Sequence, residues 1–345
     1  MNYERNKRMK KFFVYLMAGT MMATVFTGCS QGANAGAEGK AESGSAKVAL
    51  LTAVGGLGDR SFSDAAWSGF QKAEEELGVE IKVVEPQSVA DYQTSLTSVA
   101  NSGFEAIMVV GNDWADALST VAPIFPETQF LGVNIDVEGD NVAVAKFSDH
   151  EGSFIVGALA ALMSETGKIG FIGGSDVPAI NRFYVGYEEG AKYVKPEIEV
   201  VPTYIGSFAD PGKGKEFALQ LISQNVDIIF QAAGKSGEGL FEALKETEGV
   251  YGIGVDQDQD YIVEGKVLTS MIKKVDVAAY DYIEDVVNDT FEPGIKVYGL
   301  KENGVGPSEM TYTKDMISED VLMQIEDIKQ AIIDGTIKVT DVFEQ

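Results

Sequence analysis

Cysteine and histidine are nearly absent from this sequence, which has one residue of each among its 345. A cysteine-rich zinc site needs several thiolates, so a single cysteine excludes it. His150 alone is not enough for a serine or cysteine triad. It falls between two expected elements, and we expect it to be a solvated residue at the start of a helix. Chemistry that depends on thiols or imidazoles therefore fits this chain poorly.

Basic residues are also scarce, because 27 Lys and Arg stand against 53 Asp and Glu, a formal net charge of −26. Residues 1–28 carry five of the basic residues and one glutamate, so the rest of the chain has 22 against 52, or −30. Such an acidic surface repels polyanions, and we do not expect nucleic acid as a partner. The charge by itself is typical of an exported protein.

The apolar run near the N-terminus is short. It spans Phe12 to Phe26, fewer than the roughly 20 residues of a membrane-spanning helix. It follows a basic stretch between Arg5 and Lys11 and ends at small residues, which is typical of a cleavable secretory signal. The sequence therefore predicts a signal peptide over residues 1–28.

Cys29 stands at the expected cleavage point, in a segment that resembles the bacterial lipobox although Phe26 replaces the usual leucine. We therefore predict that Cys29 carries a lipid and anchors the chain to the extracytoplasmic face of the cell membrane. The alternative is an ordinary signal cleaved nearby, with an incidental cysteine. Residues 30–46 are rich in Gly, Ala and Ser without apolar periodicity, so residues 29–46 are expected to be a lipidated cysteine and its flexible tether.

Short β-branched runs alternate with amphipathic helical stretches from Lys47 to Asp276, which is the pattern of βαβ units in a parallel sheet. The expected strands form two sets of five, at 47–53, 80–84, 106–111, 129–135 and 142–146, and at 168–173, 198–204, 227–232, 251–255 and 267–272. The expected helices between them cover 63–77, 90–102, 115–122, 151–165, 182–194, 213–224 and 237–246. The chain beyond the tether is long enough for two domains.

The two sets of strands share an order of landmarks. In the first set Gly55-Gly56 precedes Phe62, and in the second set Gly173-Gly174 precedes Phe183. Further on, Val133-Asn134-Ile135-Asp136 is matched by Gly254-Val255-Asp256. The second half of the chain is therefore predicted to be a structural copy of the first.

This duplication predicts an α/β protein of two doubly wound parallel-sheet lobes joined by a hinge of several strands. The N-terminal lobe is expected to comprise residues 47–147 with part of 276–300, and the C-terminal lobe 148–275 with part of 301–345. The remaining elements are expected at 277–289 (helix), 295–300 (strand), 308–313 (extended) and 318–334 (helix). The hinge is expected near Phe147–Asp149, Lys273–Asp276 and Leu300–Gly306. Sheets of this kind bind ligands at the carboxyl ends of their strands, so the cleft between the lobes is the predicted site.

Aromatic residues follow strands in both lobes. Asp59 and Phe62 lie in the glycine-rich loop after the first strand, where Phe62 can present a flat face to the cleft. Phe183 and Phe208 are rival candidates for an opposite wall, since two aromatic faces suit a planar ring. The alternative for Phe62 is that it packs beneath its own loop.

Charged residues end two strands of the second set. Asp256 can accept hydrogen bonds from two vicinal hydroxyls of a sugar, and Lys273 can donate to a ring or hydroxyl oxygen. Gly234 ends the strand before them in the chain. The alternative is a structural ion pair between Asp256 and Lys273.

At these positions the sequence resembles the basic membrane protein family, which includes purine nucleoside receptor A, over nearly all of the mature chain. The resemblance is carried by GDRSFSD at 58–64, QAAGKSGEG at 231–239, GVDQDQ at 254–259 and LTSMIKKVD at 268–276. It implies a type I periplasmic-binding-protein fold and a lipid-anchored binding component of a nucleoside ABC transporter. It also implies that Phe62 stacks on the base, that a second-lobe aromatic residue faces it, and that Gly234, Asp256 and Lys273 hold the ribose.

The sequence departs from the family pattern at the expected base. The purine receptors commonly have an acidic or amide pair after the first strand, where this chain has Ala53-Val54, and Ser63 replaces the usual asparagine. Asp113-Trp114 replaces a small residue followed by phenylalanine. Asp113, Trp114 or Asp116 is therefore a candidate for base recognition, unless the ligand is not a purine nucleoside.

Two other motifs fail on spacing. Lys235-Ser236 resembles the end of a phosphate-binding P-loop, but the first glycine of that motif would fall at Ile229. Asp256, Asp258 and Asp260 resemble a calcium loop, but its sixth position is Tyr261 and its twelfth is Val267. We expect no metal and no cofactor.

These observations predict a monomeric, lipid-anchored receptor, not an enzyme, that captures a nucleoside and delivers it to an ABC permease. A second ligand class is another aromatic or sugar-like molecule such as riboflavin. Two other kinds of function are a ligand sensor and a surface nucleoside hydrolase acting through Asp256 and Asp258.

Overall fold

The computed structural model of the protein describes residues 45–343. The predicted signal peptide, Cys29 and nearly all of the predicted tether lie outside the described residues. In the described part of the chain, no helix is both long enough and apolar enough to cross a membrane.

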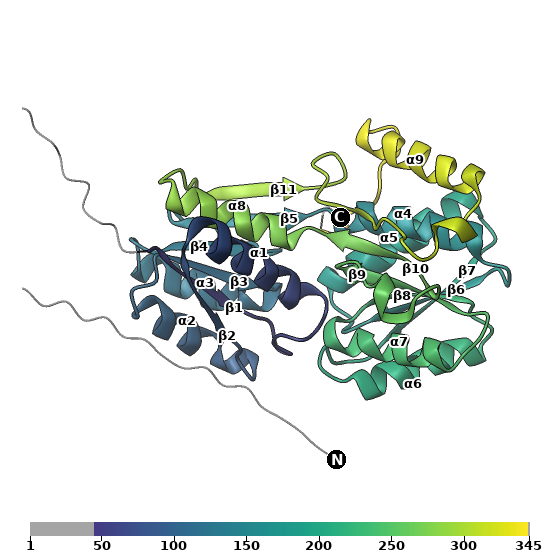
Figure 1. Cartoon of the computed structure of the whole chain (residues 1–345), viewed down its shortest axis with the longest axis horizontal. Coiled ribbons are helices and arrows are strands. Elements are labelled where there is room, and N and C mark those ends of the chain that lie inside the picture. Colours follow the sequence, from purple (N-terminus) through teal and green to yellow (C-terminus); the bar gives the residue numbers. More distant parts are fainter. Residues whose placement is uncertain (1–44, 344–345) are drawn as a thin grey trace, which may run out of the picture. The chain divides into compact units, whose positions relative to one another are not determined.

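Two six-stranded sheets form the framework, and helices flank each of them (Figure 1). The first sheet has the strand order β11-β5-β4-β3-β1-β2, and the second has β12-β10-β9-β8-β6-β7. All the pairs are parallel except β10 with β12. The strands are β1 (Lys47–Leu51), β2 (Glu80–Val84), β3 (Ala106–Val110), β4 (Gln129–Val133), β5 (Val142–Phe147), β6 (Lys168–Gly173), β7 (Glu199–Tyr204), β8 (Ile228–Ala232), β9 (Tyr251–Asp256), β10 (Val267–Lys273), β11 (Gly294–Tyr298) and β12 (Val305–Pro307).

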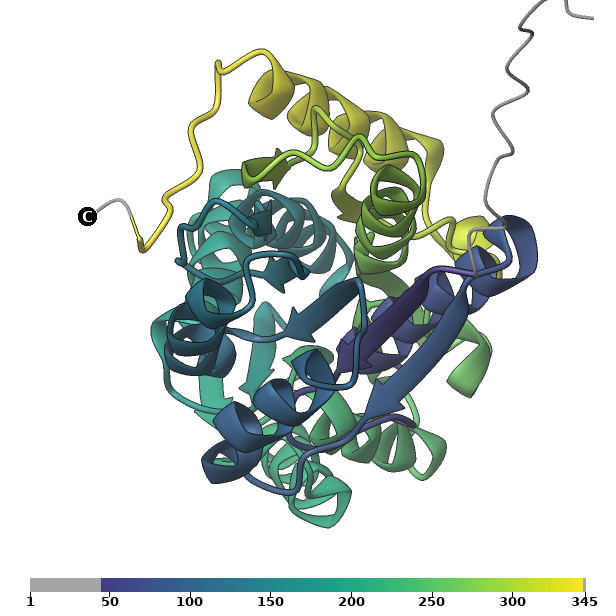
Figure 2. The ribbon, with the colours of Figure 1, turned by 90° about the vertical axis from the view of Figure 1, so that its left-hand side faces the viewer.

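The sheets and their helices define two lobes. We call the first sheet with α1 (Phe62–Leu77), α2 (Tyr92–Ala100), α3 (Ala115–Val121) and α8 (Val275–Val287) the first lobe. The second lobe is the second sheet with α4 (Asp149–Met163), α5 (Pro178–Val194), α6 (Pro211–Ser223), α7 (Glu238–Lys245) and α9 (Glu319–Ile333). In Figure 2 the purple and blue strands of the first lobe face the viewer, and yellow α9 runs along the top.

The central strands explain this layering, because β3 (AIMVV) and β8 (IIFQA) are buried along their whole length. A parallel sheet with apolar residues on both faces must be covered by helices on both sides. One apolar cluster lies between the first sheet and α2 and α3, and another lies between the second sheet and α6 and α7. A third, larger cluster extends across both lobes on the side of α1, α8, α4 and α5.

Glycines bring α4 and α5 into close contact. A Cβ at Gly157 would lie 2.1 Å from the carbonyl oxygen of Tyr187, and a Cβ at Gly186 would lie 2.3 Å from that of His150. No side chain fits at either position, so the two helices approach backbone to backbone. The start of α4 is thereby fixed against α5.

The chain crosses between the lobes in three places, after β5, after β10 and after β11. The crossing segments are hydrogen-bonded to one another. The amide of Ser148 donates to Tyr298 O at 3.1 Å, and that of Lys274 donates to Gly304 O at 2.9 Å. Three adjacent segments thus connect the lobes close to the ends of β5 and β10.

The fold class predicted from the sequence is confirmed, and each of the ten principal strands is found within two residues of its expected bounds. Two local predictions were wrong. The stretch 308–313, expected to be extended, contains a turn at residues 311–313, and the paired strand of this region lies earlier, at β12. His150 is not solvated, because α4 begins in the crowded hinge and leaves its side chain 11% exposed.

Candidate ligand-binding cleft

A cavity lies between the lobes at the carboxyl ends of their strands, where doubly wound sheets bind ligands. The first lobe lines it with Ala53, Val54, Gly55, Asp59, Phe62, Ser63, Gly111, Asn112, Asp113 and Asn134. The second lobe lines it with Ala179, Ile180, Phe183, Phe208, Ala232, Gly234, Lys235, Val255, Asp256 and Lys273. Apolar and aromatic side chains make up about half of this lining, and two of the charged residues, Asp256 and Lys273, stand at the ends of β9 and β10.

Eight of the ten predicted ligand-binding residues line this cavity, namely Asp59, Phe62, Asp113, Phe183, Phe208, Gly234, Asp256 and Lys273. Trp114 and Asp116 do not. Asn112 and Asn134 line it although no sequence motif indicated them. Both residues directly follow strands, β3 and β4. The predicted residues were found because they follow other strands of the two sheets, and the same rule would have indicated Asn112 and Asn134.

Trp114 supports the cavity wall from outside. Its indole is fully buried and stacks on Tyr92 with ring centroids 3.7 Å apart and an interplanar angle of 2°. The indole nitrogen donates to Thr52 O at 3.3 Å, and the Tyr92 hydroxyl accepts from the amide of Val54 at 3.1 Å. The expected ligand contact by Trp114 is therefore replaced by a packing role, because this side chain turns into the core and away from the cavity.

Asp116 does not line the cavity either. Its side chain belongs to an exposed residue in the first turn of α3. Asp113, in the short 3₁₀ turn Asn112–Trp114, does reach the lining. Residues three apart on a helical turn share a face only approximately, and here the cavity lies on the side of Asp113.

The loop before α1 is shaped by two carboxylates of its own. Asp59 accepts hydrogen bonds from the amides of Ser61 and Ser63, both at 2.9 Å, and from Asp64 at 3.1 Å. The Asp64 carboxylate accepts from Gly58 and Arg60, both at 2.8 Å. Burial raises the pKa of Asp59, although the three amide hydrogen bonds act in the opposite direction. This loop presents the ring of Phe62 to the cavity.

Asp256 ends β9 in a left-handed backbone conformation, with φ 65°. Its residue is 7% exposed, and Oδ2 accepts a hydrogen bond from the hydroxyl of Ser61 in the other lobe. Burial raises the pKa of Asp256 to about 6, although the charge of Lys273 and the Ser61 hydrogen bond lower it. At neutral pH the carboxylate is therefore mostly ionised and can accept further hydrogen bonds.

Lys273 ends β10 and is paired with Asp149, not with Asp256. The distance from Nζ to Asp149 Oδ1 is 3.1 Å, and both side chains are at most 4% exposed. The ammonium also lies 4.5 Å from the centroid of the Phe62 ring and 5.6 Å from that of Phe183. The alternative of a structural Asp256–Lys273 pair is not what the structure contains, and sequence inspection missed Asp149 because it formed no recognised spacing.

Phe208 rests on the backbone of its own lobe. A Cβ at Gly174 would lie 2.2 Å from Phe208 Cε1, so only glycine leaves room for the ring. Gly234, with φ 54°, passes close to the same residue, because its Cβ position is 3.5 Å from Phe208 O. Phe62, Phe183 and Phe208 thus place aromatic faces on both sides of the cavity.

The loop before α1 also bonds directly to the second lobe. Besides Ser61 and Asp256, the Gln259 amide donates to Arg60 O at 2.7 Å, and Arg60 lies 3.6 Å from Glu238. The loop before α1 is therefore in direct contact with the second lobe, as in a closed two-lobe receptor.

The chain is similar in sequence and in fold to known proteins. A family model described as "ABC transporter substrate-binding protein PnrA-like" matches residues 46–342. The "CD4+ T-cell-stimulating antigen" of Listeria monocytogenes is 38% identical, with 85% of this chain and 88% of that protein covered. The "ABC transporter nucleoside-binding protein BmpA" of Lactococcus lactis is 34% identical, with 96% and 99% covered. A crystal structure of an ABC transporter solute-binding protein from Aeropyrum pernix K1 has a TM-score of 0.80 at 34% identity, with 86% and 93% covered.

Proposed function

Because this chain belongs to the PnrA-like family of ABC transporter substrate-binding proteins, we propose that it captures a nucleoside between its lobes and delivers it unchanged to a membrane permease. The observation that carries the proposal is the composition of the cavity. It joins aromatic residues from both lobes to the buried ammonium group of Lys273 and two buried carboxylates, of which Asp59 is bonded to its own loop and Asp256 keeps an oxygen for a ligand. A nucleoside has the complementary parts, a flat base and a sugar with vicinal hydroxyls.

The base would lie between Phe62 and a second-lobe ring, for which Phe208 is the first choice and Phe183 the second. Stacking of a base on an aromatic side chain contributes about 1–3 kcal/mol and tolerates different bases. The ribose hydroxyls would donate to Asp256 and accept from Lys273, with the backbone of Gly234 close by. These contacts favour a nucleoside over a free base, because the charged groups would otherwise keep no ligand partner.

The edge of the base would face Asn112 and Asp113, since Ala53 and Val54 offer no polar side chain there. An amide and a carboxylate together can donate and accept hydrogen bonds, which suits a purine. Asp59 has its carboxylate oxygens occupied by backbone amides, so its contribution is to shape the loop that carries Phe62.

Delivery requires that the receptor stays near the permease. We propose that a lipid on Cys29 and the tether of residues 30–46 keep the monomeric lobes at the extracytoplasmic face of the membrane. A cytosolic fraction that contains the intact chain with an unmodified Cys29 would contradict this part of the proposal.

Calorimetry with a panel of purine and pyrimidine nucleosides tests the ligand class. We expect at least one purine nucleoside to bind with a stoichiometry near one, and no free base to appear during the incubation. Lack of binding by every nucleoside, with the protein verified as folded, would contradict the proposal. Native mass spectrometry of the gently purified protein would then identify any other aromatic or sugar-like ligand that it carries.

A further inference from the structure

Lys273 has a long side chain, yet its ammonium group has a defined place at the cavity. The side chain is 4% exposed and lies among aromatic rings, including Phe147 at 5.4 Å from Nζ to the ring centroid. An ammonium ion in such surroundings needs a carboxylate partner, because desolvation of an unpaired charge is costly. Asp149 is that partner. Whatever holds Asp149 in place therefore also sets the position of Lys273.

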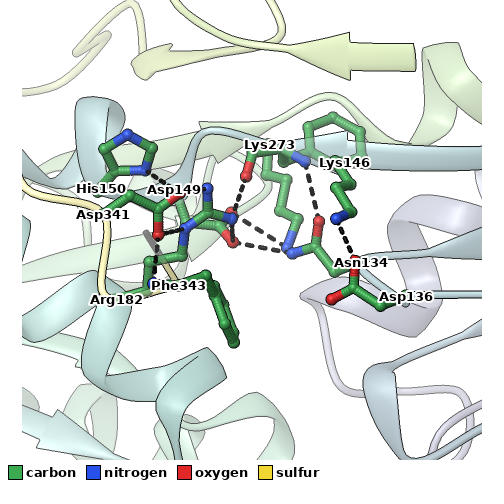
Figure 3. A network of polar contacts seen from close by, with 10 residues as sticks. Asn134, Asp136, Lys146, Asp149, His150, Arg182, Lys273, Asp341 and Phe343 are labelled. Carbon is green, nitrogen blue, oxygen red and sulfur yellow. Dashed lines mark hydrogen bonds and ion pairs between the residues drawn. The ribbon is translucent and has the colours of Figure 1, made fainter. Parts of the chain in front are cut away.

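Asp149 lies at the first turn of α4, directly after the chain leaves the first lobe. Its Oδ2 accepts a hydrogen bond from the side-chain amide Nδ2 of Asn134 at 2.8 Å and lies 3.8 Å from Arg182 Nη1. Lys273 and Arg182 thus approach the same carboxylate from different sides (Figure 3). Two cations compete for one anion unless Arg182 has a second carboxylate.

The C-terminal segment supplies that second carboxylate. We call residues 335–343, which follow α9, the strap. Asp341 of the strap binds Arg182 with both oxygens, at 2.8 Å from Nε and 2.5 Å from Nη2. The ring of Phe343 lies 5.4 Å from the guanidinium carbon of the same arginine. Bidentate pairing of this kind fixes both the position and the orientation of a guanidinium group.

Arg182 and the strap are also attached to their surroundings. Arg182 Nη1 donates to Phe147 O at 2.7 Å, at the last residue of β5, where the hinge begins. The amide of Thr340 donates to Glu189 on α5 at 2.9 Å. The strap therefore connects helix α5 to the point at which the chain crosses between the lobes.

We propose that the strap positions Lys273 for the ligand, with Asp341 engaging Arg182 so that Asp149 is left to Lys273. The charges alternate along the series Lys273, Asp149, Arg182 and Asp341, so that Lys273 is paired with Asp149 and Arg182 with Asp341. Without Asp341, the guanidinium group turns to Asp149 and displaces the ammonium of Lys273. Asp341 is then a positioning residue, which does not line the cavity and acts on the ligand through Arg182, Asp149 and Lys273.

The first test is Asp341→Asn, measured by calorimetry with adenosine, guanosine and inosine. The strap mechanism depends on the proposed nucleoside-binding function only in that nucleosides are the ligands used in this test. We expect the dissociation constant of the tightest nucleoside to rise about tenfold, because Lys273 loses its fixed position. Asp341→Glu should restore most of the affinity, and a chain that ends at Lys338 should behave like Asp341→Asn. The matched control is Asp334→Asn, which removes the same charge from an exposed position at the end of α9.

A double-mutant cycle with Lys273→Met shows whether the effect passes through Lys273. In that background Asp341→Asn should cause no further loss of affinity. Full additivity of the two losses, or an unchanged dissociation constant for Asp341→Asn alone, would overturn the proposal.

A ligand-free measurement keeps the test independent of the nucleoside claim. Acetylation of lysines, followed by mass spectrometry, reports how accessible the Lys273 amine is. We expect Asp341→Asn to raise the labelling rate of Lys273 several-fold while that of exposed Lys301 stays constant, with melting curves confirming that the variant is folded. If no nucleoside binds but Lys273 is released in this way, the ligand assignment fails and the strap mechanism stands. An unchanged labelling rate overturns the strap mechanism whatever the ligand is.

Discussion

Strand β4 of the first lobe and β9 of the second occupy equivalent places in their sheets and end in the same backbone conformation. Asn134 follows β4 with φ 53°, and Asp256 ends β9 with φ 65°, a region that Asn and Asp tolerate better than most residues. Both side chains line the cavity. Their partners differ, because Asn134 bonds to the hinge at Asp149 and Phe147, whereas Asp256 bonds across the cleft to Ser61.

The two lobes therefore share a topology but use equivalent residues differently. The amide of Asn134 has both of its ends used inside the protein, so it serves to hold the hinge. The carboxylate of Asp256 keeps an oxygen for a ligand. The carboxylates of Asp59 and Asp64, in the first-lobe loop, likewise accept hydrogen bonds from backbone amides of that loop. The second lobe contributes the buried charges of Asp256 and Lys273. The two buried charged groups that remain for a ligand, Asp256 and Lys273, therefore both come from the second lobe.

The largest effect is expected from removing the charge on the second-lobe side. Asp256→Ala should raise the dissociation constant for a nucleoside about 1,000-fold, since two hydrogen bonds to a charged acceptor contribute about 2 kcal/mol each. Calorimetry measures this, with Asp140→Ala as the control because Asp140 is an exposed carboxylate of the first lobe. Equal affinities for Asp256→Ala and the wild type would remove the proposed asymmetry between the lobes.

A smaller effect is expected on the stability of the ligand-free protein. Burial raises the pKa of Asp256 from 3.8 to about 6, so the folded state binds its proton more tightly than the unfolded state does. The stability that this group contributes is fully present below pH 3.8 and is lost as the pH rises through about 6. Asp256→Asn should therefore be more stable than the wild type above pH 6, by up to about 3 kcal/mol.

Urea unfolding between pH 4 and pH 8 measures that difference. The gap between Asp256→Asn and the wild type should close toward pH 4, where both side chains are neutral. Asp140→Asn should follow the wild-type profile throughout. A gap that does not change with pH would show that desolvation of the Asp256 charge is not its cause.

The smallest effect is expected at the aromatic wall of the second lobe. Gly174→Ala should displace the ring of Phe208, because the new Cβ would lie 2.2 Å from Cε1. The ring is only partly buried and can move outward, so stability should change little while nucleoside affinity falls about fivefold, or about 1 kcal/mol. The control is Gly212→Ala, whose Cβ would meet its nearest neighbour at 3.5 Å. Unchanged affinity of Gly174→Ala would favour Phe183 over Phe208 as the second wall.

Much of the framework could be predicted from the sequence, because the signals are local. The run Ala106–Val110 is apolar without interruption, and Ile228–Ala232 is interrupted only by Gln231, which is typical of a strand covered on both faces. Residues at the ends of such strands must meet at one edge, which is why Phe62, Asp256 and Lys273 could be assigned to one cavity. Trp114 could not be distinguished from Asp113 in the same way, because the direction of each side chain in a short 3₁₀ turn depends on Tyr92, which packs against it from α2.

The sequence by itself determined the duplication, the two doubly wound lobes and most of the residues that line the cleft. Periodicity and strand-end position carry that information within a few residues of each site. Only the tertiary structure decided the partners of the charged groups. Lys273 is paired with Asp149, and Arg182 with Asp341, residues 124 and 159 positions apart along the chain. The physical reason is that a buried charge takes the carboxylate that folding places beside it, and the hinge brings distant segments together where no local pattern records their contact.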